Sequence, residues 1–192
     1  MVKKIMQKLL KYKKYLVFVF VIIIVGFGAG FIYYHLLKSN TQNDILYTLH
    51  NLTNYRYNAI IKDLTITSLL LVLAFLVIGL PLGIFYLFYE SAALGFLFST
   101  FLAAFKIKGL FYALMVFLVN RLIPLILIVF FILRIINISR YVIGLFIYKK
   151  DQAIISKIML NFKNSLYLLV FLLLYNIFLY FVTPSIFNFL IK

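Results

Sequence analysis

The sequence contains no cysteine, so it can form neither disulfides nor thiolate metal sites, and it offers no cysteine nucleophile. Acidic residues are also scarce: 4 Asp and Glu stand against 19 Lys and Arg, for a formal net charge of +15. In a soluble protein this balance would suggest nucleic acid. Here the basic residues flank apolar runs, where they set helix orientation and contact anionic headgroups, so we expect a lipid bilayer as partner and no nucleic acid.

Polar residues are too few to cover a soluble fold. Hydrophobic residues make up 66% of the 192 positions, and the mean hydropathy is +1.13. Several apolar runs reach the ~20 residues that a helix needs to cross a bilayer. We therefore expect one all-α membrane domain over residues 1–192, a polytopic helical protein with about five spans. The many Phe, Ile, Lys, Tyr and Asn residues suggest an AT-rich bacterial genome, and hence a multi-pass protein of a bacterial cell membrane.

The N-terminal 14 residues hold six lysines and no acid, and their apolar residues predict a short amphipathic helix on the cytoplasmic headgroups. The following run, 15–37, is too long for the core of a signal peptide, so it is the expected first span, with the N-terminus cytoplasmic. Gly26 and Gly30 form a GxxxG pair there, which lets another helix approach closely. Two origins remain open for the approaching helix: another part of this chain, or a second copy in a homo-oligomer.

The polar connector 38–63 is predicted to lie outside the cell and to carry a short surface helix. His50 lies on it, and His35 lies at the end of the first span. Neither histidine has a second histidine, a cysteine or a carboxylate at ligand spacing, so no metal site is predicted.

The apolar block 64–105 is long enough for two crossings of a bilayer. Its middle is broken by GLPLG, in which Gly79 and Gly83 flank Pro81. Proline lacks a backbone donor and glycine is conformationally permissive, so this segment favours a kink or a tight reversal. Two positions for the reversal are open: at Pro81, or farther along the block.

We favour a reversal at 89–92, because it brings Glu90, the acid set deepest in apolar sequence, to the cytoplasmic interface. This choice predicts spans over 64–88 and 92–105, with Pro81 a kink inside the first of them. Lysines at 106 and 108 then flank an external turn.

A second apolar block, 110–148, is interrupted by Asn120, Arg121 and Pro124. Arg121 is the basic residue set deepest in apolar sequence. Proline inside a helical segment favours a kink or a break.

The charge pattern decides how many times this block crosses. Residues 134–163 hold six basic residues and one acid, so the positive-inside rule places them in the cytoplasm. Starting from an external turn, one crossing satisfies this rule, which predicts a broken or re-entrant helix near 110–124 and a full span over 122–147. A basic cytoplasmic loop, 148–164, and a last span, 166–182, complete the prediction.

Motifs for catalysis and cofactor binding are missing. The sequence has no HExxH, no GxSxG, no P-loop and no dinucleotide fingerprint, and its four acids are scattered, so we expect no enzyme, cofactor or metal. Glu90 and Arg121 are the exceptions to an apolar interior. Charges there are expensive, so either they pair and tie two spans together, or each extends separately to an interface.

The chain resembles a known family at this point. A basic start, a glycine-containing first span and a polar connector precede VIGLPLGIFYLFYESAALGFLFSTFLAAF, and an Asn/Pro break, a basic loop and a last span follow it. This order resembles the stage II sporulation protein M family of bacterial membrane proteins. The resemblance covers nearly the whole chain and is best over residues 78–128. In this chain Asn120 and Arg121 stand at the family's break, with Pro124 displaced.

The resemblance implies a five-span, non-enzymatic scaffold that anchors or localises membrane or extracytoplasmic partners, such as peptidoglycan hydrolases during sporulation. Similar proteins also accompany circular bacteriocins, where they assist export or immunity. A transporter-like export or immunity component is therefore the alternative function, and breaks in neighbouring apolar blocks are typical of transport sites.

Overall fold

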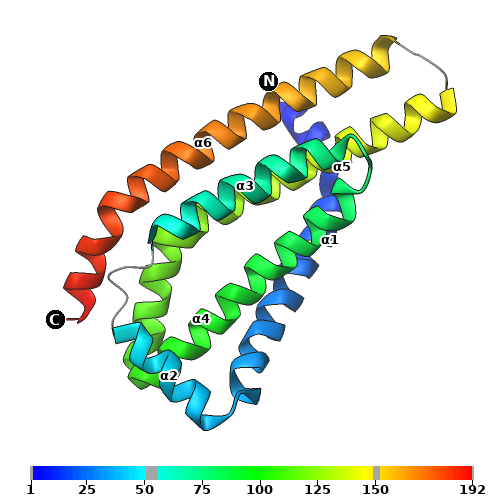
Figure 1. Cartoon of the computed structure of the whole chain (residues 1–192). Helices are drawn as coiled ribbons and strands as arrows, with labels where there is room; N and C mark the ends of the chain where they lie inside the picture. The colour runs from blue at the N-terminus through cyan, green and yellow to red at the C-terminus, as the bar shows by residue number, and fades with distance from the viewer. Residues whose placement is uncertain (1, 51–55, 149–151, 192) are drawn as a thin grey trace.

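The described residues fold into helices joined by short turns, without any strand (Figure 1). The computed structural model describes residues 2–50, 56–148 and 152–191. Its elements are α1 (Val2–Leu36), α2 (Ser39–His50), α3 (Arg56–Ala74), α4 (Gly79–Val116), the π-helical segment η2 (Phe117–Arg121), α5 (Leu122–Tyr148) and α6 (Gln152–Ile191). The expected all-α fold is confirmed.

Within the described ranges, four helical stretches are long and apolar enough to cross a membrane, and a fifth is apolar but shorter. The four are Tyr15–Leu36, Gly79–Val116, Leu122–Phe146 and Gln152–Leu179, and the shorter one is Leu64–Ala74. Because lipid offers no hydrogen bonds, each apolar run satisfies its own backbone by forming helix. The chain is a polytopic helical membrane protein.

The first helix is longer than expected. Residues 2–14, expected as a separate amphipathic helix, continue without a break into the span expected at 15–37, and α1 ends at Leu36. The side chain of Gln42 donates from Nε2 to the carbonyls of Tyr34 and Leu37, at 3.0 and 3.2 Å. These bonds satisfy carbonyls that a helix C-terminus leaves open, and they fix the start of α2 against the end of α1.

The polar connector is mostly helical. The expected surface helix in 38–63 is present as α2, and residues 56–63 already form the first turns of α3. Residues 51–55 lie outside the described part of the chain.

The reversal that follows α3 lies at residues 75–78, so the reversal expected at 89–92 is wrong. The backbone is helical from the start of α4 through Glu90 to residue 105. The spans expected at 64–88 and 92–105 are thus replaced by α3 and by the first part of α4.

Contacts made at the turn, some of them by residues distant in sequence, explain this position of the reversal. Val77 has a positive φ of 65°, and the Ser139 hydroxyl of α5 donates to the carbonyl of Ala74, the last residue of α3, at 3.1 Å. A Cβ at Gly79 would collide with the Ala74 backbone, so glycine allows α4 to start beside α3. Pro81 then lies in the first turn of α4, where its missing N–H leaves no helical bond unmade, and not at a kink inside a span.

Lys106 makes the next reversal and divides α4 into two arms, 79–105 and 107–116. Its φ of 53° and ψ of −130° are not helical. The arms pack against each other around the buried ring of Phe101. Gly109 approaches the Phe101 carbonyl so closely that no Cβ would fit, which makes the hairpin tight at its tip. A turn at the lysines 106 and 108 was expected, and it is present.

Residues 107–148 form one bent helical path. Val116 (φ −62°, ψ −40°) and Leu122 (φ −63°, ψ −49°) are helical on either side of η2, so the chain does not turn back there. Of the two arrangements expected near 110–124, the broken helix is the one found, and the expected span 122–147 coincides with α5.

The basic loop expected at 148–164 is largely helical, because α6 begins at Gln152. Residues 149–151 lie outside the described residues. The expected last span, 166–182, lies within α6, which continues past Pro184 to Ile191.

The two ends of the bundle differ in character. The start of α1, the α3–α4 reversal and the region where α5 gives way to α6 lie toward one end, called here the basic end (Figure 1). The Arg140 guanidinium lies 5.4 Å from the centroid of the Tyr15 ring, which joins α5 to α1 there. The opposite end, called here the hairpin end, carries α2 and the reversal at Lys106. The lysine-rich start of α1 thus lies toward the same end as the end of α5 and the start of α6.

Candidate functional site

The two charges that the sequence sets deepest in apolar segments meet in the structure. Arg121, the last residue of η2, places Nη1 3.3 Å from Oε2 of Glu90 on α4. The Glu90 side chain is 9% exposed and that of Arg121 is 33% exposed. The carboxylate is therefore inside the bundle, while the guanidinium reaches it from a partly exposed position.

Hairpin geometry explains why these residues meet. Glu90 and Arg121 are almost equally far from the reversal at Lys106, so antiparallel arms place them at the same level. Phe98 of the first arm also packs against Phe117 of η2, with their ring centroids 6.1 Å apart. Two charges in apolar segments that lie opposite each other in this way neutralise one another without leaving the bilayer.

The π-helical turn beside this pair has an identifiable cause. In an α-helix the amide of residue 124 would donate to the carbonyl of Asn120, but Pro124 has no amide hydrogen. The backbone widens just before the proline, and the N–H of Leu122 donates to the carbonyl of Phe117, five residues back. Asn120 thus lies within the π turn beside Arg121, and Pro124 is buried in the first turn of α5.

Gly26 and Gly30 pack within the chain, against α4. A Cβ at Gly26 would come within 2.7 Å of the Phe88 carbonyl oxygen, and one at Gly30 would collide with the backbone of Ala92. Of the two partners left open by the sequence, the helix that approaches this pair in the structure belongs to the same chain. The contact lies beside Glu90, so α1 supports the helix that carries the carboxylate.

Sequence reasoning missed the other half of this contact. Ser91, Gly95 and Ser99 are buried at four-residue spacing on α4, and Gly95 meets the Phe27 carbonyl of α1 without room for a Cβ. The Ser99 hydroxyl donates to the carbonyl of Phe31 at 3.2 Å. The spacing of small residues was the signal that could have revealed this face.

Gly79, Pro81 and Gly83 do not belong to the site. They lie in the first turns of α4 toward the basic end, where Gly79 and Pro81 serve the reversal. A Cβ at Gly83 would make ordinary contacts with Ile132 and Ile135 of α5, at 3.7 and 3.9 Å. These positions shape the fold and are separated from the ion pair by most of two helical turns or more.

A second polar contact joins α5 to α6 through Arg134, whose charge served only the topology prediction in the sequence analysis. Arg134 donates from Nη1 to Oδ1 of Asn161 at 3.1 Å, and Nδ2 of Asn161 donates to the carbonyl of Lys157 at 2.8 Å. Buried polar groups need such partners. The contact holds α5 and α6 together.

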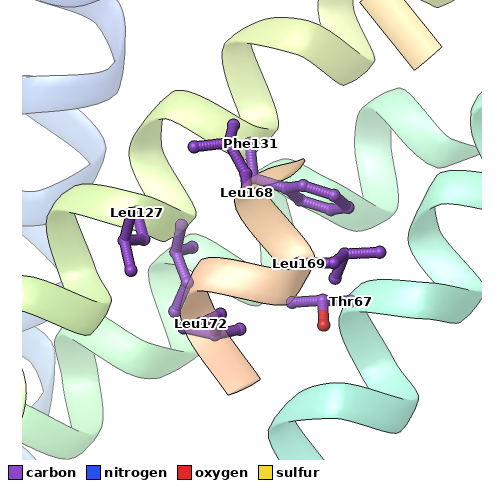
Figure 2. A pocket seen from close by; sticks show the side chains of 7 residues that line it. Thr67, Leu127, Phe131, Leu168, Leu169 and Leu172 are labelled. Carbon is purple, nitrogen blue, oxygen red and sulfur yellow. The ribbon is translucent and has the colours of Figure 1, made fainter. Parts of the chain in front are cut away.

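The cavity in Figure 2 lies between α3, α5 and α6. It measures about 10 Å³ and is lined by Thr67, Leu127, Ile128, Phe131, Leu168, Leu169 and Leu172. Apart from Thr67 the lining is apolar, and the Thr67 hydroxyl donates to the carbonyl of Leu64 at 3.2 Å. Such a void has the size of about one water molecule, too small for an organic ligand.

No group of three or more His, Cys, Asp and Glu side chains that could hold a metal ion occurs among the described residues. His35 is exposed, and its ring centroid lies 5.2 Å from that of Phe31 with the two rings tilted by 54°. The chemistry at the ion pair is that of one carboxylate and one guanidinium, which can neutralise each other and fix two helices in register.

Comparison of the chain with protein-family models, with curated proteins and with solved structures finds no match. The fold and the site define a polytopic helical membrane protein whose central hairpin is held by an intramembrane ion pair.

Proposed function

We propose that this protein is a non-enzymatic membrane scaffold of the stage II sporulation protein M type, which anchors partner proteins at the hairpin end. The observation that carries the proposal is the way α2 is held on that end. Gln42 of α2 donates to the carbonyl of Tyr34 in the last turn of α1 and to that of Leu37, just after it, and α2 also contacts α4. Close helix packing and the ion pair hold the hairpin itself, so its tip and α2 offer one fixed surface.

This surface, called here the hairpin-end surface, combines two kinds of contact group. On α2 the side chains of Asn40, Thr41, Asn43 and Asp44 are exposed and polar. At the hairpin tip Ile107 is 90% exposed between two exposed lysines. An apolar side chain rimmed by polar and charged groups is typical of protein contact sites. The partner we propose is an extracytoplasmic or membrane-bound protein such as a peptidoglycan hydrolase.

The orientation in this proposal places the hairpin end outside a bacterial cell membrane and the basic end in the cytoplasm, because lysine-rich segments stay inside. The absence of native cysteine makes a direct test possible. In intact cells, Asn43→Cys should react with a membrane-impermeant thiol reagent, and Lys157→Cys should react only after permeabilisation. The reverse pattern would overturn the orientation.

Partner binding is tested with a photo-crosslinking amino acid at position 107 in living cells, followed by mass spectrometry of the products. We expect a cell-wall hydrolase or another extracytoplasmic protein. The matched control places the crosslinker at Phe171, which is 64% exposed on α6. Products that are the same at both positions, or no protein product at position 107, would overturn the scaffold role.

A transporter-like export or immunity component is a second candidate, favoured by the π turn and the buried ion pair in neighbouring helices. Interrupted helices and charged groups within a membrane domain are features of transport sites. Single cysteines introduced over 77–124 discriminate the two functions. A continuous line of water-accessible positions from one end to the other supports transport, and lipid-protected positions throughout support the scaffold.

A further inference from the structure

A groove runs along the bundle between α1 and α5. It encloses about 270 Å³ and is lined by apolar side chains, among them Leu16, Phe20 and Ile23 of α1 and Ile126, Val129 and Phe130 of α5. α1 packs on α4 through its glycines, and the contact between Tyr15 and Arg140 joins α1 to α5 at one end of the groove. Several lining side chains are well exposed, including Phe20 at 62% and Phe130 at 52%. In a membrane, this surface meets lipid.

The groove leads to a cationic group at the basic end. Tyr15 directly precedes Leu16 and lies one helical turn before Val19, and its ring lies beneath the Arg140 guanidinium. Arg140 is exposed, and among the described residues no carboxylate pairs with it. A guanidinium has five N–H donors, and stacking on a ring leaves those at its edge free to bind an anion.

We propose that the groove binds one acyl chain of an anionic phospholipid whose phosphate lies against Arg140 and the Tyr15 hydroxyl. The groove extends along about two turns of α1, 16–23, and about one and a half turns of α5, 125–130, which suits part of one hydrocarbon chain. An all-apolar groove excludes water, and the positive group at its end complements a phosphate.

The two parts of the site have different tasks. Lipid tails are as apolar as leucine, so moving a chain from bulk bilayer into the groove gains little by itself. The headgroup contact therefore supplies the selectivity, while the groove fixes where the lipid lies. The site should prefer phosphatidylglycerol over phosphatidylcholine with the same chains, and Arg140 should account for that preference.

Native mass spectrometry of the full chain in mild detergent, titrated with these two lipids, tests the proposal. We expect more bound phosphatidylglycerol than phosphatidylcholine, and a drop of roughly fivefold in phosphatidylglycerol affinity with Arg140→Gln, as for one basic group near an anionic headgroup. The control Lys163→Gln, at an exposed position on α6, should leave binding unchanged. Equal binding by the wild type and Arg140→Gln, or equal loss with both variants, would overturn the site.

The groove is tested with Ile126→Trp, which fills it, and with Leu174→Trp as the control on the exposed face of α6. Ile126→Trp should weaken the binding of both lipids, and Leu174→Trp should leave the binding of both unchanged. Unchanged binding by Ile126→Trp would overturn the groove assignment. Full competition by glycerol 3-phosphate, which has the phosphate without a chain, would also overturn it. So would the finding of a dimer that only Ile126→Trp dissociates.

A measurement on the unmodified chain keeps the test independent of variant folding. The probe is a phosphatidylglycerol with a photoreactive acyl chain, present at low level in phosphatidylcholine vesicles that contain the protein. Labelled peptides should come from residues 16–23 and 125–130. Labelling spread evenly over all exposed helices would show bulk lipid contact only and would overturn the proposal.

Discussion

Removing either partner of the intramembrane ion pair leaves a different charge behind. Arg121→Gln leaves the Glu90 carboxylate, which is nearly buried, whereas Glu90→Gln leaves the guanidinium of Arg121, which is a third exposed. The double variant leaves two neutral amides. Because a buried charge without its partner is costly and an exposed one is not, the three variants should differ strongly in stability.

The magnitudes follow from this exposure. Without its partner, the Glu90 carboxylate can avoid the free-energy cost of a buried charge by taking up a proton. For an ordinary glutamate at pH 7, protonation itself costs about 3.7 kcal/mol. Arg121→Gln should therefore lower the free energy of unfolding by about 3–4 kcal/mol, since breaking buried pairs costs this much. Glu90→Gln should cost only about 1–2 kcal/mol, because the guanidinium can reach an interface.

The double variant buries no unpaired charge. Its free energy of unfolding should therefore be lower than that of the wild type by at most about 1–2 kcal/mol. The cycle then gives a coupling free energy of about 2–5 kcal/mol, from the upper part of the usual range for residues in contact to above it.

Unfolding of the purified protein in mild detergent, titrated with a denaturing detergent and followed by far-UV circular dichroism, measures these differences. The chain has no tryptophan, so the helical signal is the natural probe. Lys163→Gln, which removes an exposed charge from α6, is the control and should change stability by less than about 0.5 kcal/mol. If the two single effects add in the double variant to within about 0.5 kcal/mol, the reasoning is refuted.

Three further substitutions test the packing with the same assay. Gly30→Ala should lower the free energy of unfolding by about 1–3 kcal/mol, because its Cβ meets the α4 backbone. Gly28 has open space around it, so Gly28→Ala should raise the free energy of unfolding by up to about 1 kcal/mol through the higher helix propensity of alanine. Lys106→Gly should stabilise by about 1 kcal/mol, because the positive φ is strained in lysine, whereas Lys108→Gly should cost about 1 kcal/mol. Ser139→Ala removes the hydrogen bond to the last carbonyl of α3 and should cost about 1–2 kcal/mol.

The paired controls decide how these results are interpreted. Equal effects at Gly30 and Gly28 would mean that α1 does not approach α4 as closely as described. Equal effects at Lys106 and Lys108 would contradict the reversal at Lys106. A neutral Ser139→Ala, judged against Ser156→Ala at an exposed position on α6, would remove the hydroxyl from the explanation of the α3–α4 turn.

The sequence by itself determined the all-α class and the membrane setting. Both depend on local physics: apolar runs of span length have no hydrogen-bonding partner in lipid except their own backbone, so they must be helical. It also marked Glu90 and Arg121, because charge is rare inside such runs, and it located the break near Pro124, because proline removes a helical hydrogen bond wherever it stands.

Only the tertiary structure decided where the chain reverses and which residues come into contact. Proline near the start of a helix and proline at a kink are identical in sequence, and Pro81 was assigned to the kink. The difference depends on contacts made by distant residues, such as the Ser139 hydroxyl that binds the last carbonyl of α3. Once the reversal lies at 75–78, α4 carries Glu90 down one arm of the hairpin, and the turn at Lys106 brings Arg121 back to the same level.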